Sequence, residues 1–349
     1  MKNGRVFSII SRDGGDEVKI NIKTISDRTG FSQATVSNVL NRKKGVKAST
    51  AEEILRVARE VGYISSESGV EDIRLVMYKK SGEILTETPL INALLEGVES
   101  EAKRNGLSTI ISNLSEGEPD FESKLSGILS LQNSGILLLA TEMEWEDMRQ
   151  FEGLRNRLVV VDAWFREGNF DTVLMNNTDS FYSLVEYLHA NGHRRIGLVE
   201  SSTEIRNFRY RKRGFFNAMQ DFGLPCEEPV RVGPTMVDAY KDMKAYLETG
   251  PALPTAFCAI NDIVAFGVMK ALKECKYRIP EDVSVVGFDN MPFCDITSPP
   301  LTTINVQKRE MGEAAVRRVL EKMENRADSP MKLQLLTSFC ERSSVRKLI

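Results

Sequence analysis

Residues 22–41 have the sequence I-K-T-I-S-D-R-T-G-F-S-Q-A-T-V-S-N-V-L-N, in which apolar side chains recur every three or four residues on both sides of a glycine. This spacing predicts two short amphipathic helices joined by a tight turn, the pattern of a helix-turn-helix. Asn21 is a favourable N-cap for the first helix. Gly30 suits the turn because it lacks a Cβ that would obstruct a left-handed backbone. We expect Ser32 to cap the second helix.

The second predicted helix has two chemically different faces. Val36, Val39 and Leu40 fall on one face at helical spacing, so they should pack inward. The opposite face carries amide and hydroxyl side chains, which can hydrogen-bond to base edges in a DNA major groove. We therefore predict that Gln33, Ala34 and Asn38 contact base edges and that Thr35, Ser37, Asn41 and Lys43 contact phosphates.

The distribution of charge favours a nucleic-acid partner for this region. Between residues 18 and 64 there are nine Lys or Arg and four Asp or Glu, a net charge of +5, whereas the whole chain carries −3. Residues 1–17 hold three of each sign, so residues 65–349 carry −8. A small basic domain on a large acidic one fits DNA binding, because phosphate neutralisation supplies the sequence-independent part of the affinity. The alternative is a solvated helical surface.

The length of 349 residues and the hydrophobic content of 42% indicate a globular protein with one small domain and one large or divided domain. No run approaches the ~20 apolar residues of a membrane helix, and the apolar run near the start is too short for a secretory signal, so we expect a cytoplasmic protein. The five cysteines are scattered without a C-x-x-C, which predicts neither a disulfide framework nor a zinc site.

The sequence offers little for catalysis or cofactor binding. His189 and His193 are the two histidines, and Gly192 between them predicts a helix stop, which favours a structural role over metal binding. The sequence contains no G-x-S-x-G, no P-loop and no G-x-G-x-x-G. We therefore predict a protein that is not an enzyme and that uses no cofactor and no metal.

After residue 65 the pattern changes to short apolar runs separated by amphipathic stretches. Runs of this kind that alternate with helices predict parallel sheets covered on both faces, and the length of about 270 residues predicts two such sheets. The predicted strands lie at 73–78, 107–112, 135–140, 157–162, 172–176, 194–200, 255–262 and 282–289.

Polar residues follow several of these predicted strands. In parallel α/β sheets ligands bind beyond the carboxyl ends of the strands, where carboxylates and amides from different strands converge. Such a set could bind a polyhydroxylated ligand, although each residue alone could equally cap the following helix. The residues at these positions are Asp162, Asn176, Asn177, Asn261, Asp262, Asp289 and Asn290.

Over nearly its whole length the chain resembles the LacI/GalR family of transcription regulators. The residues that carry the resemblance are the helix-turn-helix above, L-H-A-N-G-H-R-R-I-G-L-V at 188–199, R-K-R-G-F at 211–215, A-I-N-D-I-V-A-F-G-V-M-K-A-L at 259–272, I-P-E-D-V-S-V-V-G-F-D-N at 279–290 and P-P-L-T-T-I at 299–304. The resemblance implies an all-α helix-turn-helix head followed by a periplasmic-binding-protein-like core of two α/β subdomains with doubly wound parallel sheets.

Domain boundaries follow from the resemblance and the pattern together. We expect an N-terminal arm at 1–17, a DNA-binding domain at 18–64, a short linker at 65–72 and an effector-binding and dimerisation core at 73–349. Within the core, the first subdomain should comprise about 73–174 and 305–331, and the second about 175–304 and 332–349.

The resemblance also implies an effector site between the two subdomains. A carboxylate, an arginine and an amide in such a cleft could bracket vicinal hydroxyls of a sugar or a sugar phosphate. Trp164 could add a stacking surface, because aromatic rings pack well against sugar faces, although packing in the core is the alternative. The residues that match the family's effector positions are Thr88, Pro89, Asp162, Arg211, Asn261 and Asp289.

The chain departs from the family pattern in two regions that bear on DNA recognition. The segment S-S-E-S-G-V-E-D at 65–72 is short and acidic and lacks the apolar side chain that family members insert into the minor groove. DNA binding would then depend on the heads alone. Asn38 stands where the family commonly has Arg, and Asn prefers adenine to guanine.

The sequence as a whole predicts a repressor that binds a near-palindromic operator as a homodimer and is released by a small carbohydrate-like effector. A dimer is expected because no heptad repeat follows R-S-S-V-R at 342–346. Three alternatives stay open: a cytoplasmic sugar sensor with weak or non-specific DNA binding, an enzyme built on the α/β body, and a regulator whose cleft binds a partner protein.

Overall fold

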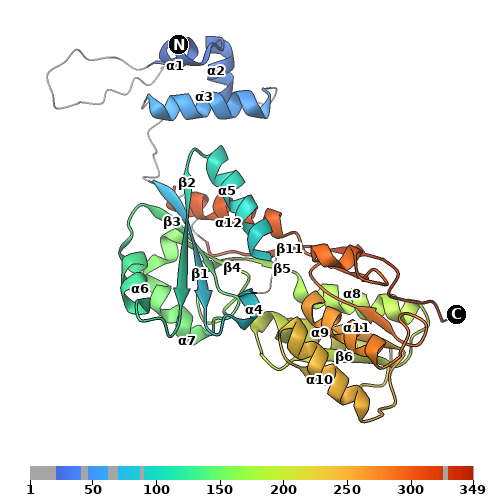
Figure 1. Ribbon diagram of the computed structural model, residues 1–349. Helices are drawn as coiled ribbons and strands as arrows, with labels where there is room; N and C mark the ends of the chain where they lie inside the picture. The colour runs from blue at the N-terminus through green and yellow to red at the C-terminus, as the bar shows by residue number, and fades with distance from the viewer. Residues whose placement is uncertain (1–20, 41–45, 62–69, 87–89, 325–328, 349) are drawn as a thin grey trace. The chain divides into compact units, whose positions relative to one another are not determined.

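The computed structural model describes residues 21–40, 46–61, 70–86, 90–324 and 329–348 (Figure 1). These residues form two compact units, a small helical unit that ends before Val70 and a larger unit that contains the strands. The predicted N-terminal arm and residues 65–69 of the predicted linker lie outside the described residues.

The small unit consists of α1 (Ile22–Thr29), α2 (Gln33–Leu40) and α3 (Ala48–Glu60). The predicted caps of the first two helices are confirmed. The Asn21 side chain accepts a hydrogen bond from the Thr24 amide, and the Ser32 hydroxyl accepts one from the Thr35 amide at 3.1 Å. Gly30 has a φ of 73°, the left-handed conformation that ends α1.

The core of this unit explains why three short helices hold together. Val36 and Val39 are buried as predicted, and Leu40 is partly buried against the same cluster. Burying these side chains stabilises helices that would be too short to form alone in water. The buried members of the cluster are Ile25, Val36, Val39, Ile54, Val57 and Ala58.

The larger unit contains two parallel sheets, as the alternating pattern predicted. The six-stranded sheet has the order β11-β5-β4-β3-β1-β2, and all of its pairs are parallel. Its strands are β1 (Asp72–Lys79), β2 (Ser108–Ser115), β3 (Ser134–Leu139), β4 (Leu158–Val161), β5 (Asp171–Met175) and β11 (Lys332–Leu335).

Helices cover both faces of the six-stranded sheet (Figure 1). On one face α6 (Phe121–Ser130), α7 (Trp145–Met148) and η1 (Arg149–Arg157) enclose an apolar core over β1, β3 and β4. The other face carries α12 (Lys308–Met323), which packs against β3, β4 and β5. α5 (Leu90–Arg104) packs closely on α12, since a Cβ added at Gly97 would lie 2.0 Å from the Arg309 carbonyl oxygen.

The four-stranded sheet has the order β7-β6-β8-β9, with β6 (Ile196–Ser201), β7 (Val230–Val232), β8 (Ala256–Ala259) and β9 (Ser284–Val286). Right-handed crossovers put α9 (Arg206–Asp221) on one face and α10 (Met236–Glu248) and α11 (Asp262–Glu274) on the other. α8 (Asn177–Ala190) packs beside α9. β8 and β9 are short and fully buried because both faces of the sheet are covered, whereas the edge strand β7 carries the exposed Arg231.

The chain passes between the two sheets at three places, after β5, after β10 (Thr303–Asn305) and after β11. The predicted division placed residues from 332 onward in the second subdomain, but Lys332–Leu335 pairs with β5 in the six-stranded sheet. The chain leaves the first sheet after β11, and β12 (Ser338–Cys340) pairs antiparallel with β10 in a separate two-stranded sheet. Backbone pairing with β5 therefore shifts this boundary by several residues.

Within the described ranges, no helix is both long enough and apolar enough to cross a membrane.

Candidate functional site

The exposed face of α2 is the first candidate site. Gln33, Ala34 and Asn38 are exposed, as contact with base edges requires. Thr35 and Ser37 are partly buried, and the Thr35 hydroxyl lies 2.9 Å from that of Ser32. Their part in DNA binding stays a prediction. The predicted phosphate contacts Asn41 and Lys43 lie outside the described residues.

The second candidate site is a buried polar network where the carboxyl ends of the two sheets meet. Asp162 follows β4 in a left-handed conformation with a φ of 65°. Its Oδ1 accepts a hydrogen bond from the Asn207 amide of α9 at 2.9 Å, and its Oδ2 accepts one from the Thr141 hydroxyl at 2.6 Å. Asn207 Oδ1 in turn accepts from the Asn177 amide at 3.0 Å. The network thus links the six-stranded sheet to α8 and α9.

Arg211 extends this network from α9 to the end of the second sheet. Its Nε donates to Asn177 Oδ1 at 2.9 Å, and its Nη1 donates to the Ile260 carbonyl at 2.9 Å. Its Nη2 lies 3.4 Å from Asp289 Oδ1, and the guanidinium carbon lies 3.8 Å from the ring centre of Phe288. Asp162, Arg211 and Asp289, predicted from three separate segments, are therefore brought together.

Burial sets the ionisation of this network. It raises the pKa of Asp162 to about 6, although the Thr141 hydrogen bond and the Arg211 charge lower it. The pKa of Asp262 is also raised to about 6, first by burial and then by the charge of Asp289. Burial lowers the pKa of Arg211, whereas Asp289 and Asp162 raise it. Burial thus disfavours the charged forms of both acids and of Arg211.

Other predicted site residues lie elsewhere. Asn261 caps α11 by accepting a hydrogen bond from the Val264 amide at 2.9 Å, and Asn176 caps α8, so the capping alternative is confirmed for both. Trp164 lies outside the network, with the Lys332 ammonium 4.1 Å from its ring centre. Thr88 and Pro89 lie outside the described residues.

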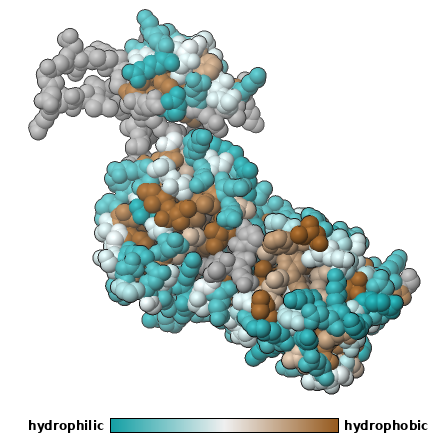
Figure 2. Space-filling view, viewed as in Figure 1, coloured by the Kyte–Doolittle hydropathy of each residue, from teal (hydrophilic) through white to brown (hydrophobic). Residues whose placement is uncertain are grey.

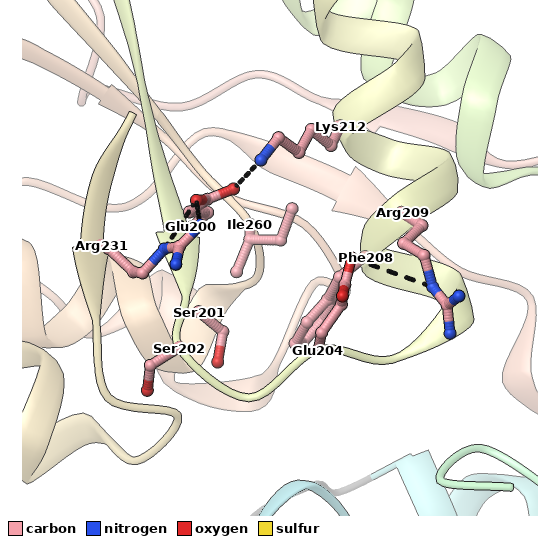
Figure 3. A pocket seen from close by; sticks show the side chains of 9 residues that line it. All are labelled: Glu200, Ser201, Ser202, Glu204, Phe208, Arg209, Lys212, Arg231 and Ile260. Atoms are coloured by element: carbon pink, nitrogen blue, oxygen red, sulfur yellow. Dashed lines mark hydrogen bonds and ion pairs between the residues drawn. The ribbon is translucent and has the colours of Figure 1, made fainter. Parts of the chain in front are cut away.

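A pocket of about 110 Å³ adjoins the network at the carboxyl edge of the four-stranded sheet (Figure 3). Glu200, next to the last residue of β6, lines it. Its Oε2 accepts from the Lys212 ammonium at 2.5 Å and its Oε1 from Arg231 Nε at 3.0 Å. Phe208 and Ile260 line the pocket and also contact Arg211, so the pocket and the network share a wall. The remaining lining residues are Ser201, Ser202, Glu204 and Arg209.

Neither Glu200 nor Arg231 was predicted from the sequence. Glu200 ends a predicted strand at 194–200, and that position alone could have placed it with the other strand-end carboxylates. The position of Arg231 could not be predicted in this way, because its strand has only three residues and the apolar pattern did not predict that strand. A second hollow, of about 660 Å³, is lined by residues 276–281 and by Pro299.

Contacts between loops of the first sheet and the segment at 203–209 lie beside this pocket. Glu144, before α7, accepts from Arg206 at 2.7 Å and also from Arg209. The Thr203 hydroxyl donates to Glu83 of α4 (Glu83–Thr86) at 3.0 Å. In the described part of the chain, no cluster of His, Cys, Asp or Glu could hold a metal ion.

Comparison with known proteins agrees with this arrangement. Residues 21–66 match the family described as bacterial regulatory proteins, lacI family, and residues 185–345 match the periplasmic binding protein-like domain. The HTH-type transcriptional repressor PurR of Pasteurella multocida is 26% identical over 93% of this chain and 98% of its own length. PurR of Yersinia pestis is 29% identical over 93% of this chain and 96% of its own.

Solved structures show the same fold. A lac repressor dimer bound to operator and the anti-inducer ONPF has a TM-score of 0.69 at 21% identity, covering 94% of this chain and 99% of its own. A complex of the transcriptional regulator CelR with cellobiose has a TM-score of 0.71 at 20% identity, covering 93% of this chain and 99% of its own.

A helix-turn-helix head joined to a two-sheet core of the periplasmic-binding-protein type defines a class of bacterial transcription regulators. The chain belongs to the LacI family of these regulators.

Proposed function

We propose that this protein is a repressor that binds a near-palindromic operator as a homodimer and releases it when a small carbohydrate-like effector binds between the two sheets. The observation that carries the proposal is a basic helix-turn-helix with an exposed polar face, in one chain with a polar pocket at the carboxyl edge of a sheet. The repressors named PurR support it over nearly the full length. We also propose that the DNA-binding domain ends near residue 64 and that the protein is cytoplasmic and not an enzyme.

The DNA-binding part of the proposal rests on α2. In helix-turn-helix proteins the second helix enters the major groove, and its exposed residues contact base edges. Gln33 and Asn38 can each form two hydrogen bonds with adenine, whereas Ala34 offers a methyl group to thymine. Thr35, Ser37, Asn41 and Lys43 would contact the backbone phosphates. The operator would therefore contain A·T pairs at the positions that Gln33 and Asn38 contact.

The effector part rests on the contacts between the two sheets. Asp162 and Asn207, and Glu144 and Arg206, join the first sheet to α9, the helix that also lines the pocket. A ligand that strengthens or breaks these contacts would shift the balance between closed and open arrangements. Solved relatives with bound cellobiose and ribose support a carbohydrate as the ligand class.

The homodimer is supported by an exposed apolar patch on the larger unit. Phe293 is 55% exposed and Ile296 is 75% exposed, both in or next to η2 (Pro292–Asp295). The Phe293 ring lies 6.4 Å from that of Phe266 on α11, and α11 packs against α10, on which Met236 and Val237 are exposed. Apolar patches of this kind on a folded protein mark interaction surfaces. We propose that a second copy of the chain covers this patch.

The test is fluorescence anisotropy of the purified chain with DNA fragments from its promoter neighbourhood, at two salt concentrations, with and without a panel of sugars. Tight binding to one palindromic fragment, released by one sugar, is the expected result. Equal and steeply salt-dependent binding to every fragment would instead mean that the head gives only phosphate attraction, and the sugar-sensor alternative would replace the proposal.

A further inference from the structure

We propose that the carboxylate of Asp262 positions η2 and thereby holds Phe293 and Ile296 in the surface that a second copy of the chain covers. Asp262 is itself fully buried, so it is a positioning residue that acts through η2. The inference rests on the proposed function, because that proposal places the dimer interface on this surface. Three observations carry it: the hydrogen bonds of Asp262, the space that the fold leaves for its carboxylate, and the contacts between α11 and η2.

The carboxylate of Asp262 is bonded to η2 at two points. Its Oδ2 accepts a hydrogen bond from the Met291 amide at 2.9 Å and another from the Cys294 thiol at 3.1 Å. Met291 directly precedes η2, and Cys294 is the third of its four residues. One oxygen atom therefore fixes both the backbone at the start of η2 and a side chain within it.

The other carboxylate oxygen anchors Asp262 to the interior of the larger unit. Oδ1 accepts a hydrogen bond from the Thr303 hydroxyl of β10 at 2.7 Å. A Cβ added at Gly287 would lie 2.1 Å from this oxygen, so the absence of a side chain at Gly287 leaves the space that the carboxylate occupies. Asp262 is also the first residue of α11. The carboxylate thus joins η2 to two largely buried elements, β10 and α11.

The same face of α11 contacts η2 a second time. Phe266 lies one turn after Asp262, and residues four apart on a helix are neighbours on its surface. The Phe266 ring lies 6.4 Å from that of Phe293 in an edge-to-face arrangement. Figure 2 shows that apolar side chains gather in patches on the otherwise largely hydrophilic surface of the larger unit. Phe293 and Ile296 are 55% and 75% exposed, so η2 is fixed on its inner side while it presents apolar side chains to solvent.

A buried carboxylate favours one arrangement of its partners over others. Burial disfavours the charged form and raises the pKa of Asp262 to about 6, so the group is still ionised at neutral pH. A buried charge is tolerated only when hydrogen bonds replace those it made with water. Asp262 is therefore satisfied only when Met291, Cys294 and Thr303 occupy their places, which specifies the position of η2.

An ion pair also contacts η2 from outside. Arg342 Nε lies 2.6 Å from Asp295 Oδ1, but the Asp295 side chain is 70% exposed, and water screens such a pair. The hydrogen bonds of Asp262 are buried and are not screened in this way. We therefore expect Asp262 to contribute more than Arg342 to the position of η2.

The test measures the dissociation constant of the dimer of the full-length protein, by sedimentation velocity over a concentration series with a fluorescent label at the N-terminus. Asp262→Asn should raise this constant by about tenfold or more, since the amide nitrogen cannot accept a hydrogen bond and a two-fold symmetric interface contains the change twice.

A matched pair of substitutions at Cys294 tests the contact with η2 without altering the acid. Cys294→Ala removes the thiol donor and should raise the dissociation constant by about three- to tenfold. Cys294→Ser keeps a donor of similar size and should give the wild-type value within about twofold. Glu274→Gln is the control for charge, because Glu274 lies at the other end of α11 and accepts from Tyr240 and Lys244. It should leave the constant unchanged.

Hydrogen exchange separates positioning from a general loss of stability. The measurement uses the Ile296→Asp background, because a charge in the apolar patch should remove the contribution of the dimer. In that background Asp262→Asn should speed the exchange of amides at 291–297 by about tenfold while amides at 266–274 of α11 keep their rates. Equal acceleration of both segments would mean that Asp262 only stabilises the larger unit.

Three results would overturn the proposal: an unchanged dissociation constant in Asp262→Asn, equal constants for Cys294→Ala and Cys294→Ser, or equal acceleration of exchange in both segments. If Asp262→Asn does not fold, the two Cys294 variants decide. If Ile296→Asp gives monomers and Asp262→Asn does not weaken the dimer, the positioning role fails while the proposed interface stands. If Ile296→Asp leaves the dimer intact, the proposed interface fails, and the positioning role fails with it.

Discussion

The Nδ2 atom of Asn207 lies 2.9 Å from Asp162 Oδ1 and 3.0 Å from the Asp162 carbonyl oxygen. One amide thus holds both the backbone and the side chain of the residue that follows β4. Because Asn207 belongs to α9 and Asp162 to the first sheet, this contact joins the two halves of the core at the wall of the proposed effector site.

Replacing Asp162 with Asn should stabilise the protein at neutral pH. The folded-state pKa of about 6 for Asp162 lies above its ordinary value of 3.8, so the folded state binds a proton more tightly than the unfolded state between these values. The free energy of unfolding of the wild type should therefore fall as pH rises from about 4 to 6. In Asp162→Asn this part of the decrease should be absent. The free energy of unfolding of the variant at pH 7.5 should therefore exceed that of the wild type by up to about 3 kcal/mol.

This prediction is checked by urea denaturation of both proteins between pH 4.5 and 7.5. Asp262, whose pKa is also raised to about 6, titrates in both proteins, so the difference between them isolates Asp162. A difference that does not change across this pH range would contradict the assignment.

Glu144→Gln should weaken effector binding modestly. Its carboxylate pairs with Arg206 and Arg209 across the two sheets, but its side chain is 37% exposed and water screens the interaction. We expect effector affinity to fall by about two- to fivefold and its salt dependence to decrease. Glu118→Gln, which breaks an exposed pair with Lys124 far from the pocket, is the control. Equal effects of both variants would exclude a specific role for Glu144.

Asn38→Ala should reduce specific operator affinity by about 1–3 kcal/mol, roughly 5- to 150-fold, because it removes a base contact. Binding to unrelated DNA should stay unchanged, since that binding depends on phosphates. The measurement is anisotropy with the operator and with a scrambled fragment. Glu53→Ala on the exposed side of α3 serves as the control. An equal loss of affinity for the operator and for the scrambled fragment would instead mean that Asn38 contacts phosphates.

Ile296→Asp should convert the dimer into monomers, because it places a charge in the apolar patch proposed for the interface. Sedimentation velocity gives the mass of each protein, and operator anisotropy should show a loss of at least about tenfold, since each head alone contacts half of the operator. Leu336→Asp is the control, because Leu336 is equally exposed at 75% but lies after β11, outside the patch.

Lowering the pH should destabilise the C-terminal segment because His193 becomes protonated. Its Nδ1 lies 2.9 Å from the Thr255 hydroxyl and its Nε2 lies 3.1 Å from the Arg346 carbonyl oxygen. Burial lowers the pKa of His193 below its usual 6.5, so the unfolded state binds more protons as pH falls below that value and stability is lost.

Hydrogen exchange of residues 342–348 at pH 7.5 and 5.5 measures this effect. We expect faster exchange at the lower pH after correction for intrinsic rates. Hydrogen exchange in His193→Gln should not show this pH dependence. The substitution should lower the free energy of unfolding by about 1–3 kcal/mol at pH 7.5, because a buried hydrogen-bond partner is left unsatisfied. Identical exchange of the wild type at both pH values would show that His193 does not titrate in this range.

Much of the candidate site could be located from sequence because strand ends are recognisable. Asp162 and Asp289 are predicted from strand ends and Arg211, on α9, from the family resemblance, and the structure brings the three together. Their partners were not recognisable: Asn207 is one polar residue among many on α9, and Arg231 lies on an edge strand of three residues. Asn207 lies 45 residues from Asp162 in the chain, and the packing of α9 brings the two side chains together. A local sequence pattern does not predict that packing.

The sequence alone determined the features that depend on neighbouring residues. Asn21 and Ser32 cap helices through partners three residues away, Gly30 adopts the turn because it lacks a Cβ, and apolar spacing marks helices and strands through the side that each buries. Only the tertiary structure decided that β11 joins β5, that Asn207 reaches Asp162, and that Glu200 lies between Lys212 and Arg231. These outcomes depend on the packing of segments distant in the chain, since burial selects which polar groups become partners.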